Sequence, residues 1–114
     1  MTTERRRKAS SRPRGDADAK KYLERIVGGQ ITLGAFIEAI RQGEEMTQAE
    51  LAAKLGITKS HLCDIERGRK LVSPERASRF AELLGYSSDQ FVRLALQDAV
   101  DRAGLPYKVE VTAA

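Results

Sequence analysis

The chain is poor in the residues that carry metal, redox and catalytic chemistry. It has one cysteine, Cys63, and one histidine, His61, which excludes an internal disulfide, a zinc-ligand cluster and a histidine metal pair. No motif supports a catalytic triad around His61. Tryptophan is absent, and three Phe and three Tyr leave the expected core mainly aliphatic. We therefore expect no cofactor, no metal and no enzymatic activity.

Long apolar runs are also missing. No stretch approaches the roughly 20 residues that a membrane-spanning helix needs. The arginine-rich beginning lacks the apolar region of a secretory signal peptide. At 114 residues the chain has room for one domain with a modest core. These features, with the unpaired cysteine, predict a cytoplasmic protein that does not act at a membrane.

The net charge of +4 is unevenly distributed along the chain. Residues 1–21 hold eight basic and three acidic residues, whereas the remainder holds twelve basic and thirteen acidic. Within the remainder, residues 54–79 hold seven basic side chains against three acidic ones. A local basic excess of this kind favours contact with nucleic acid phosphates.

The first 20 residues combine Arg, Ser, Pro and Gly without apolar periodicity, which predicts a flexible basic arm. The arm could contact phosphates or enter a minor groove, and the alternative is a solubilising tail. We expect a helical domain over residues 21–104 and a separate C-terminal segment, residues 105–114. Capping residues and glycines predict helices at 19–27, 33–42, 48–55, 59–66, 74–84 and 88–103. In the fifth of these the expected inward residues are Ala77, Phe80, Leu83 and Leu84.

Two of these helices are expected to fold tightly against each other. Thr47 and Glu50 have the spacing of a capping box, so a helix begins at Gln48. Gly56 can end that helix in the left-handed conformation, and Thr58 can cap the next one. Two short helices around a glycine turn are typical of a helix-turn-helix, which places its second helix in the major groove of DNA.

The second helix of the pair has a polar outer side. Leu62 and Ile65, three residues apart, are expected to face inward. The outward positions are then Lys59, Ser60, His61 and Asp64. Short polar side chains at the exposed beginning of a helix suit contact with base edges.

Residues 41–85, less than half of the chain, resemble the phage-repressor family of helix-turn-helix proteins, also called the XRE type. The resemblance is carried by Gln48, Ala52, Gly56, Leu62 and the run Ile65-Glu66-Arg67-Gly68. It implies an all-α, five-helix DNA-binding domain with the recognition helix at residues 58–66. Several relatives have Gln or Ser where this chain has Lys59 and Asp64, so the resemblance does not supply the operator sequence.

The resemblance also implies roles for individual residues. In the family, the residue matching Gln48 binds a phosphate, and those matching Arg41 and Glu66 form an ion pair between helices. Base contacts are implied for Lys59, Ser60, His61 and Asp64. The expected phosphate contacts are Gln48, Thr58, Arg67, Arg69 and Lys70. Asp64 would repel phosphates unless it accepts from a cytosine amino group or pairs with Arg67 or Lys59, and the sequence leaves these alternatives open.

The last predicted helix carries two apolar stripes about 100° apart, more than a surface helix needs. One consists of Phe91, Leu94 and Ala95, and the other of Val92, Leu96, Ala99 and Val100. The second stripe predicts a homodimer interface, with burial against the first helix as the alternative.

The C-terminal segment changes to a period of two. Tyr107, Val109 and Val111 alternate with polar residues, which predicts a short β-strand. Such a strand could pair with its copy in a dimer or extend the sheet of another protein, and the alternative is a frayed terminus. The expected dimer contacts are Phe91, Val92, Ala95, Leu96, Ala99, Val100, Val109 and Val111.

Two functions are consistent with these patterns. The first is a homodimeric, sequence-specific transcriptional repressor that binds an inverted-repeat operator in double-stranded DNA and is nucleoid-associated when bound. The second is an antitoxin that binds a toxin protein and autoregulates its operon.

Overall fold

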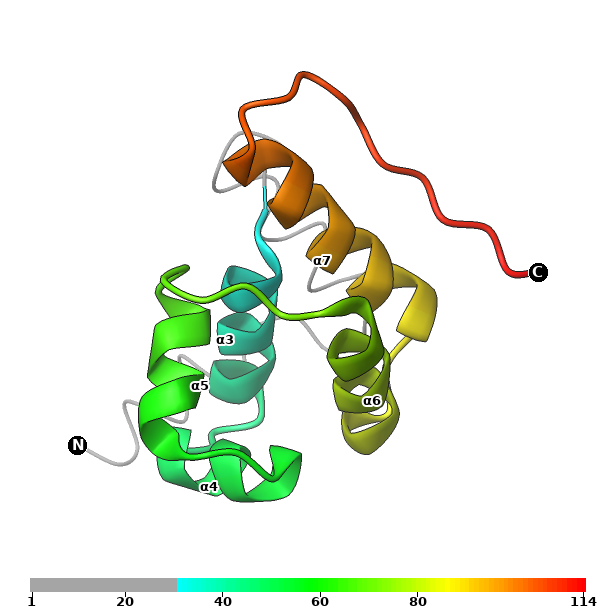
Figure 1. The fold of residues 1–114 in the computed structure, drawn as a ribbon. Coiled ribbons are helices and arrows are strands. Elements are labelled where there is room, and N and C mark those ends of the chain that lie inside the picture. Colours follow the sequence, from blue (N-terminus) through cyan, green and yellow to red (C-terminus); the bar gives the residue numbers. More distant parts are fainter. Residues whose placement is uncertain (1–30) are drawn as a thin grey trace.

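The computed structural model describes residues 31–114, and this part of the chain forms five α-helices (Figure 1). They are α3 (Leu33–Gly43), α4 (Gln48–Leu55), α5 (Lys59–Glu66), α6 (Pro74–Leu84) and α7 (Ser88–Arg102). The expected all-α class is confirmed. The basic arm and the helix predicted at residues 19–27 lie outside the described residues. None of the five helices is long and apolar enough to cross a bilayer.

Each helix begins directly after a side chain that accepts a backbone hydrogen bond from its first turn. The five capping residues are Thr32, Thr47, Thr58, Ser73 and Ser87. Gly56 and Gly85 end α4 and α6 with φ angles of +74° and +77°, in the left-handed region that favours glycine. Within residues 31–114 the predicted helices agree with the structure to within one residue at each end, because caps and glycines are local signals.

Helix α3 lies at the centre of the molecule (Figure 1). The pair α4 and α5 packs on one side of it, and α6 and α7 pack against each other on the other side. Phe36 of α3, Phe80 of α6 and Phe91 of α7 are fully buried in the core between them. The rings of Phe36 and Phe91 meet edge to face, with centroids 5.5 Å apart.

One predicted core residue of α6 is wrong. The side chain of Leu83 is 41% exposed, whereas Ala77, Phe80 and Leu84 are buried as expected. The remaining inward position is Ala81, which is fully buried. The inward face of α6 is therefore narrow: it includes the small Ala81 and leaves the larger Leu83 outside the core.

The predicted C-terminal β-strand is also wrong, because residues 31–114 contain no strand. The segment turns back after α7 and runs in an extended form outside this helix (Figure 1). Gln97 of α7 holds it: Nε2 donates to the Tyr107 carbonyl and Oε1 accepts the Val109 N–H, both at 2.8 Å. A period-two pattern favours extended backbone, but a β-strand also needs a neighbouring strand to bond its backbone groups. Here the side-chain amide of Gln97 makes those hydrogen bonds.

A carboxylate from α7 caps the central helix. Asp98 Oδ2 accepts the N–H of Leu33, the first residue of α3, at 3.0 Å, and this N–H has no partner within its own helix. The pKa of Asp98 is raised from 3.8 to about 6, mainly by partial burial and to a smaller extent by the charge of Asp101, while the Leu33 hydrogen bond and Arg102 act in the opposite direction. The carboxyl group thus takes up a proton more readily in the folded state than in an unfolded chain.

The raised pKa of Asp98 predicts that the free energy of unfolding falls as the pH rises from about 4 to about 6. Within this range the folded chain binds more protons at Asp98 than the unfolded chain does, so its contribution is complete below pH 4 and lost above 6. Asp98→Asn keeps an acceptor for Leu33 and removes the titration. Urea unfolding at pH 4.5 and pH 7.5 should show the variant gaining stability relative to the wild type at the higher pH.

The matched control for this experiment is Asp101→Asn, which removes a neighbouring exposed carboxylate from the same helix. It should leave most of the wild-type pH dependence in place. The assignment to Asp98 is contradicted if the stability of Asp98→Asn changes in parallel with that of the wild type.

Candidate nucleic-acid interface

The α4–α5 turn has the geometry that its sequence predicts. The Thr47 hydroxyl accepts the Glu50 N–H at 3.1 Å, and the Glu50 carboxylate accepts the Thr47 N–H at 2.8 Å, so the capping box is complete. After Gly56, the Ile57 N–H donates to the Ala52 carbonyl at 3.0 Å. This turn brings α5 across α4 and exposes one side of α5.

Helix α5 has a buried side and a polar side. Leu62 and Ile65 are buried, as predicted. The Thr58 hydroxyl accepts the His61 N–H at 3.0 Å and so satisfies one of the free amides at the beginning of the helix. Lys59 and Ser60 are exposed, and His61 and Asp64 are half-buried. The four predicted base-contacting side chains therefore lie outside the core, on a helix whose opposite side is anchored in the core by Leu62 and Ile65.

The backbone of α3 touches the backbone of α5. A Cβ atom built on Gly34 would lie only 1.9 Å from the Ile65 carbonyl oxygen, so no other residue fits at this crossing without movement. This contact joins positions 31 residues apart, and no local pattern predicts it. The only signal was a glycine inside a predicted helix, which is a costly choice unless a close approach requires it.

Glu66 joins three helices at the end of α5. Its carboxylate accepts from Arg41 Nε of α3 at 2.8 Å, from Arg41 Nη2 at 3.2 Å and from Gln48 Nε2 of α4 at 2.9 Å. The Glu66 side chain is 1% exposed and that of Arg41 14%. Arg41 Nη1 also donates to the Met46 carbonyl at 3.1 Å. A largely buried, bidentate ion pair thus holds α5 against α3, and Gln48 connects α4 to the same carboxylate.

Gln48 has a structural contact in addition to the phosphate contact that the resemblance implies. Its amide nitrogen donates a hydrogen bond to the Glu66 carboxylate. An amide nitrogen carries two hydrogens, so one donor remains after this bond. Gln48 is therefore also a structural residue of the site, which the sequence analysis did not predict.

The chain turns back over α5 after Gly68, whose φ of +78° lies in the left-handed region. The Asp64 carbonyl accepts the N–H groups of Arg69 at 2.8 Å and Lys70 at 3.3 Å. Arg69 Nε also donates to Asp64 Oδ1 at 2.8 Å. Asp64 thus pairs with Arg69, not with the neighbours that the sequence analysis considered, because the turn returns Arg69 to the last turn of the helix. Arg102 of α7 donates to the Gly68 carbonyl and fixes the turn from the other side.

The other expected phosphate contacts lie around this turn. Arg67, Arg69 and Lys70 are exposed. The basic residues of α6, Arg76 and Arg79, line a separate groove beside the α4–α5 turn together with Glu75 and Glu82. The basic residues of the segment 54–79 are therefore divided between the surface next to α5 and the groove beside α6.

The predicted dimer contacts separate into two groups. Phe91 and Ala95 are buried in the core of their own chain, so they are not available to a partner. The outer group is half-buried apart from the exposed Ala99, and it comprises Val92, Leu96, Ala99, Val100, Val109 and Val111. The two apolar stripes of α7 thus have different surroundings, and the second lies outside the core cluster.

Comparison with known proteins bears on the same segment of the chain. A family profile described as helix-turn-helix matches residues 37–91. This segment of the chain is therefore similar to the helix-turn-helix family. Two proteins of Bacillus phage phi105 are similar to the chain: the "ImmF control region 10 kDa protein" is 42% identical over 52 residues, and the "Immunity repressor protein" is 40% identical over 55 residues.

These alignments cover 46% and 48% of this chain and 58% and 38% of the two relatives. No solved structure matches the chain at comparable significance. The matched segment contains the helix-turn-helix pair, its ion pair with α3, and α6. Gly34, Asp98 and Arg102 lie outside residues 37–91, so the close crossing of α3 and α5, the cap of α3 and the contact to the Gly68 carbonyl depend on residues that flank the matched segment.

Proposed function

We propose that this protein is a sequence-specific DNA-binding transcriptional repressor that acts as a homodimer on an inverted-repeat operator. The observation that carries the proposal is the two-sided character of α5, which is buried on one side, tied by Glu66 to α3 and α4, and polar on the other. The helix-turn-helix profile and the similarity to a phage protein named as an immunity repressor support it. They favour a repressor over the antitoxin alternative.

In this proposal α5 enters the major groove and its outward side chains read base edges. Lys59 and Ser60 occupy the first turn, where a recognition helix comes closest to the bases, and His61 and Asp64 follow along the same side. Lysine donates to guanine O6 and N7, and serine and histidine can contact several bases. The discrimination between sequences therefore depends on these four side chains.

Backbone contacts would fix the orientation of the domain on the duplex. Arg67 and Lys70 are exposed next to the end of α5 and supply positive charge to phosphates. Gln48 and Thr58 supply weaker contacts from the beginnings of α4 and α5, where the unpaired amides and the helix dipoles favour anions.

The second apolar stripe of α7 supplies the proposed dimer interface. Val92, Leu96 and Val100 are half-buried and lie outside the core cluster, and the C-terminal segment adds Val109 and Val111 near the same helix. In dimeric helix-turn-helix proteins the two recognition helices lie about 34 Å apart, one turn of DNA, and a two-fold pair of these domains would have to meet that spacing.

Selection of bound fragments from random double-stranded DNA tests the proposal. We expect the wild type to select an inverted repeat whose half-sites are separated by one helical turn. Lys59→Ala and His61→Ala should each relax the preference at specific positions, by about 1–3 kcal/mol of discrimination per lost contact. The matched control is Lys54→Ala, which removes an exposed lysine from α4 and should leave the preference unchanged.

Two results would contradict the proposal at different levels. A wild-type chain that retains no duplex at low ionic strength is not a DNA-binding repressor. A selected site without two-fold symmetry, together with a monomeric sedimentation coefficient at micromolar concentration with and without DNA, would reject the homodimer and leave DNA binding intact.

A further inference from the structure

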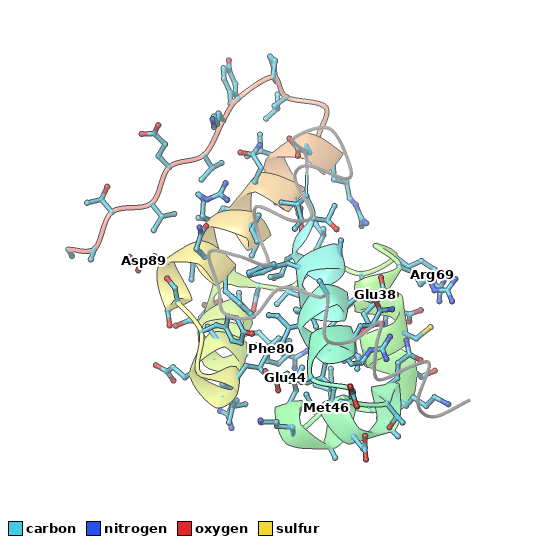
Figure 2. The ribbon with its side chains drawn as sticks, turned by 180° about the vertical axis from the view of Figure 1, so that it is seen from behind. Glu38, Glu44, Met46, Arg69, Phe80 and Asp89 are labelled. Atoms are coloured by element: carbon cyan, nitrogen blue, oxygen red, sulfur yellow. The ribbon has the colours of Figure 1, made fainter. Side chains whose placement is uncertain are left out.

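An ion pair joins the last turn of α5 to the turn that follows it. Asp64 Oδ1 accepts from Arg69 Nε at 2.8 Å, and Arg69 Nη2 lies 3.7 Å from the Cys63 sulfur. The Asp64 side chain is 28% exposed and that of Arg69 59%. Figure 2 shows Arg69 at the outer edge of the molecule, beside the end of α5. The pair therefore lies where the proposed function places the bases and phosphates.

Arg69 is held in place by more than this ion pair. Its own N–H donates to the Asp64 carbonyl at 2.8 Å, so backbone and side chain of Arg69 both bind the same residue. The left-handed Gly68 makes this return possible, and Arg102 fixes the Gly68 carbonyl. The guanidinium is thus positioned by the turn before any DNA arrives.

The pairing solves an electrostatic problem of the recognition helix. A free carboxylate in the major groove would be repelled by the phosphates on both sides. The positive charge of Arg69 compensates the negative charge of Asp64 at short range, and its Nε donates a hydrogen bond to Oδ1. Within residues 31–114, Asp64 Oδ2 accepts no hydrogen bond, so one oxygen of the pair keeps its acceptor capacity.

We propose that Asp64 reads a cytosine in each half-site and that Arg69 is its positioning residue, not a phosphate contact. The inference rests on the proposed function and specifies one base of the operator. Asp64 Oδ2 accepts from the cytosine N4 amino group, while Arg69 orients the carboxylate and compensates its charge.

The chemistry of the major-groove edges selects cytosine among the four bases. Guanine presents only acceptors there, and thymine presents an acceptor and a methyl group, so neither donates to a carboxylate. Adenine has an amino group, but its N7 acceptor lies beside it and repels the second oxygen of the carboxylate. The cytosine N4 donor has its own C5–H on one side and the O6 of the paired guanine on the other, whereas adenine N6 lies between two acceptors.

The test compares base preference and salt dependence in four variants of the full chain. Asp64→Asn has both an acceptor and a donor, so we expect its preference at one position of each half-site to change from cytosine to adenine, which an asparagine binds through N6 and N7. Arg69→Ala should reduce the preference for cytosine at that position about tenfold, as expected for loss of an oriented hydrogen bond to a charged group. Arg69→Lys, which keeps the charge without the planar fork, should restore only part of it.

Lys70→Ala is the matched control, since it removes the same charge from the adjacent residue of the turn. It should reduce the slope of log affinity against log salt by about one unit and leave the base preference unchanged. Arg69→Ala should show the reverse, a changed preference at one position with little change in the slope.

The outcomes separate this inference from the proposed function. If the wild type selects an operator but Arg69→Ala behaves like Lys70→Ala, Arg69 is a phosphate contact and the inference is wrong. An operator whose selected bases are unaffected by Asp64→Asn also overturns it. If the wild type selects no duplex at all, the proposed function fails first, and the inference fails with it.

Discussion

Replacement of Gly34 by alanine is expected to lower the free energy of unfolding by about 3 kcal/mol. The added Cβ would lie 1.9 Å from the carbonyl oxygen of Ile65, 2.9 Å from its carbonyl carbon and 3.2 Å from Glu66 Cα. All three are backbone atoms, so the clash is relieved only by moving α3 and α5 apart. The expected sign is opposite to the usual one, since alanine inside a helix is about 1 kcal/mol more favourable than glycine.

Urea unfolding followed by circular dichroism measures this effect, and Gly85→Ala is the matched control. Gly85 has a φ of +77°, but a Cβ built there meets no atom within 4 Å. The control should therefore cost only the conformational strain of a left-handed alanine, about 1 kcal/mol. Equal losses at the two positions would mean that α3 and α5 can separate freely, and would contradict the close approach.

Replacement of Glu66 by alanine is expected to lower the free energy of unfolding by about 3–5 kcal/mol. The change leaves the Arg41 guanidinium buried with its charge uncompensated, and it removes the acceptor of Gln48. Arg41 would retain the Met46 carbonyl and a distant contact of 3.9 Å with Glu38. Neither replaces a bidentate carboxylate in a site that excludes water.

A double-mutant cycle tests whether the energy comes from this pair. The double variant Arg41→Ala/Glu66→Ala should be less destabilised than the sum of the two single variants, because the second change removes the charge that the first left unpaired. Asp64→Ala is the matched control, since it breaks the exposed pair with Arg69 and should change stability by about 1 kcal/mol or less. If Glu66→Ala costs no more than this control, the triad of Arg41, Gln48 and Glu66 does not hold α5.

The helices of this domain can be predicted from the sequence because their limits depend on neighbouring residues. Thr47 and Glu50 are three residues apart, and Gly56 follows α4 directly, so the information lies within one or two turns of the chain. The polar outer side of α5 follows from the positions of Leu62 and Ile65 in the same way.

The errors have a different origin, in the environment of each segment. The apolar residues of α6 predict Leu83 as a core residue, but the packing of this helix leaves Leu83 exposed and buries Ala81. The alternation at Tyr107 and Val109 predicts an extended segment correctly and a strand incorrectly, since strand formation depends on a partner strand.

Contacts between distant positions were not predictable from any local pattern. Asp98 and Leu33 are 65 positions apart, and Arg41 and Glu66, 25 positions apart, were paired only through the family resemblance. The Asp64–Arg69 pair spans only five positions, but its formation requires the left-handed turn at Gly68 to reverse the chain. The residues of the candidate site were therefore accessible from the sequence, whereas the links that orient them were not.

The close approach at Gly34 also limits how α3 and α5 can move relative to each other. Because the Ile65 peptide group lies directly against α3 at this crossing, a tilt or slide of α5 towards α3 would meet backbone atoms and not compressible side chains. Under the proposed function, the outward side chains of α5 would then reach the duplex from a fixed helix, so that substitutions among them would change base preference without changing how the helix is held.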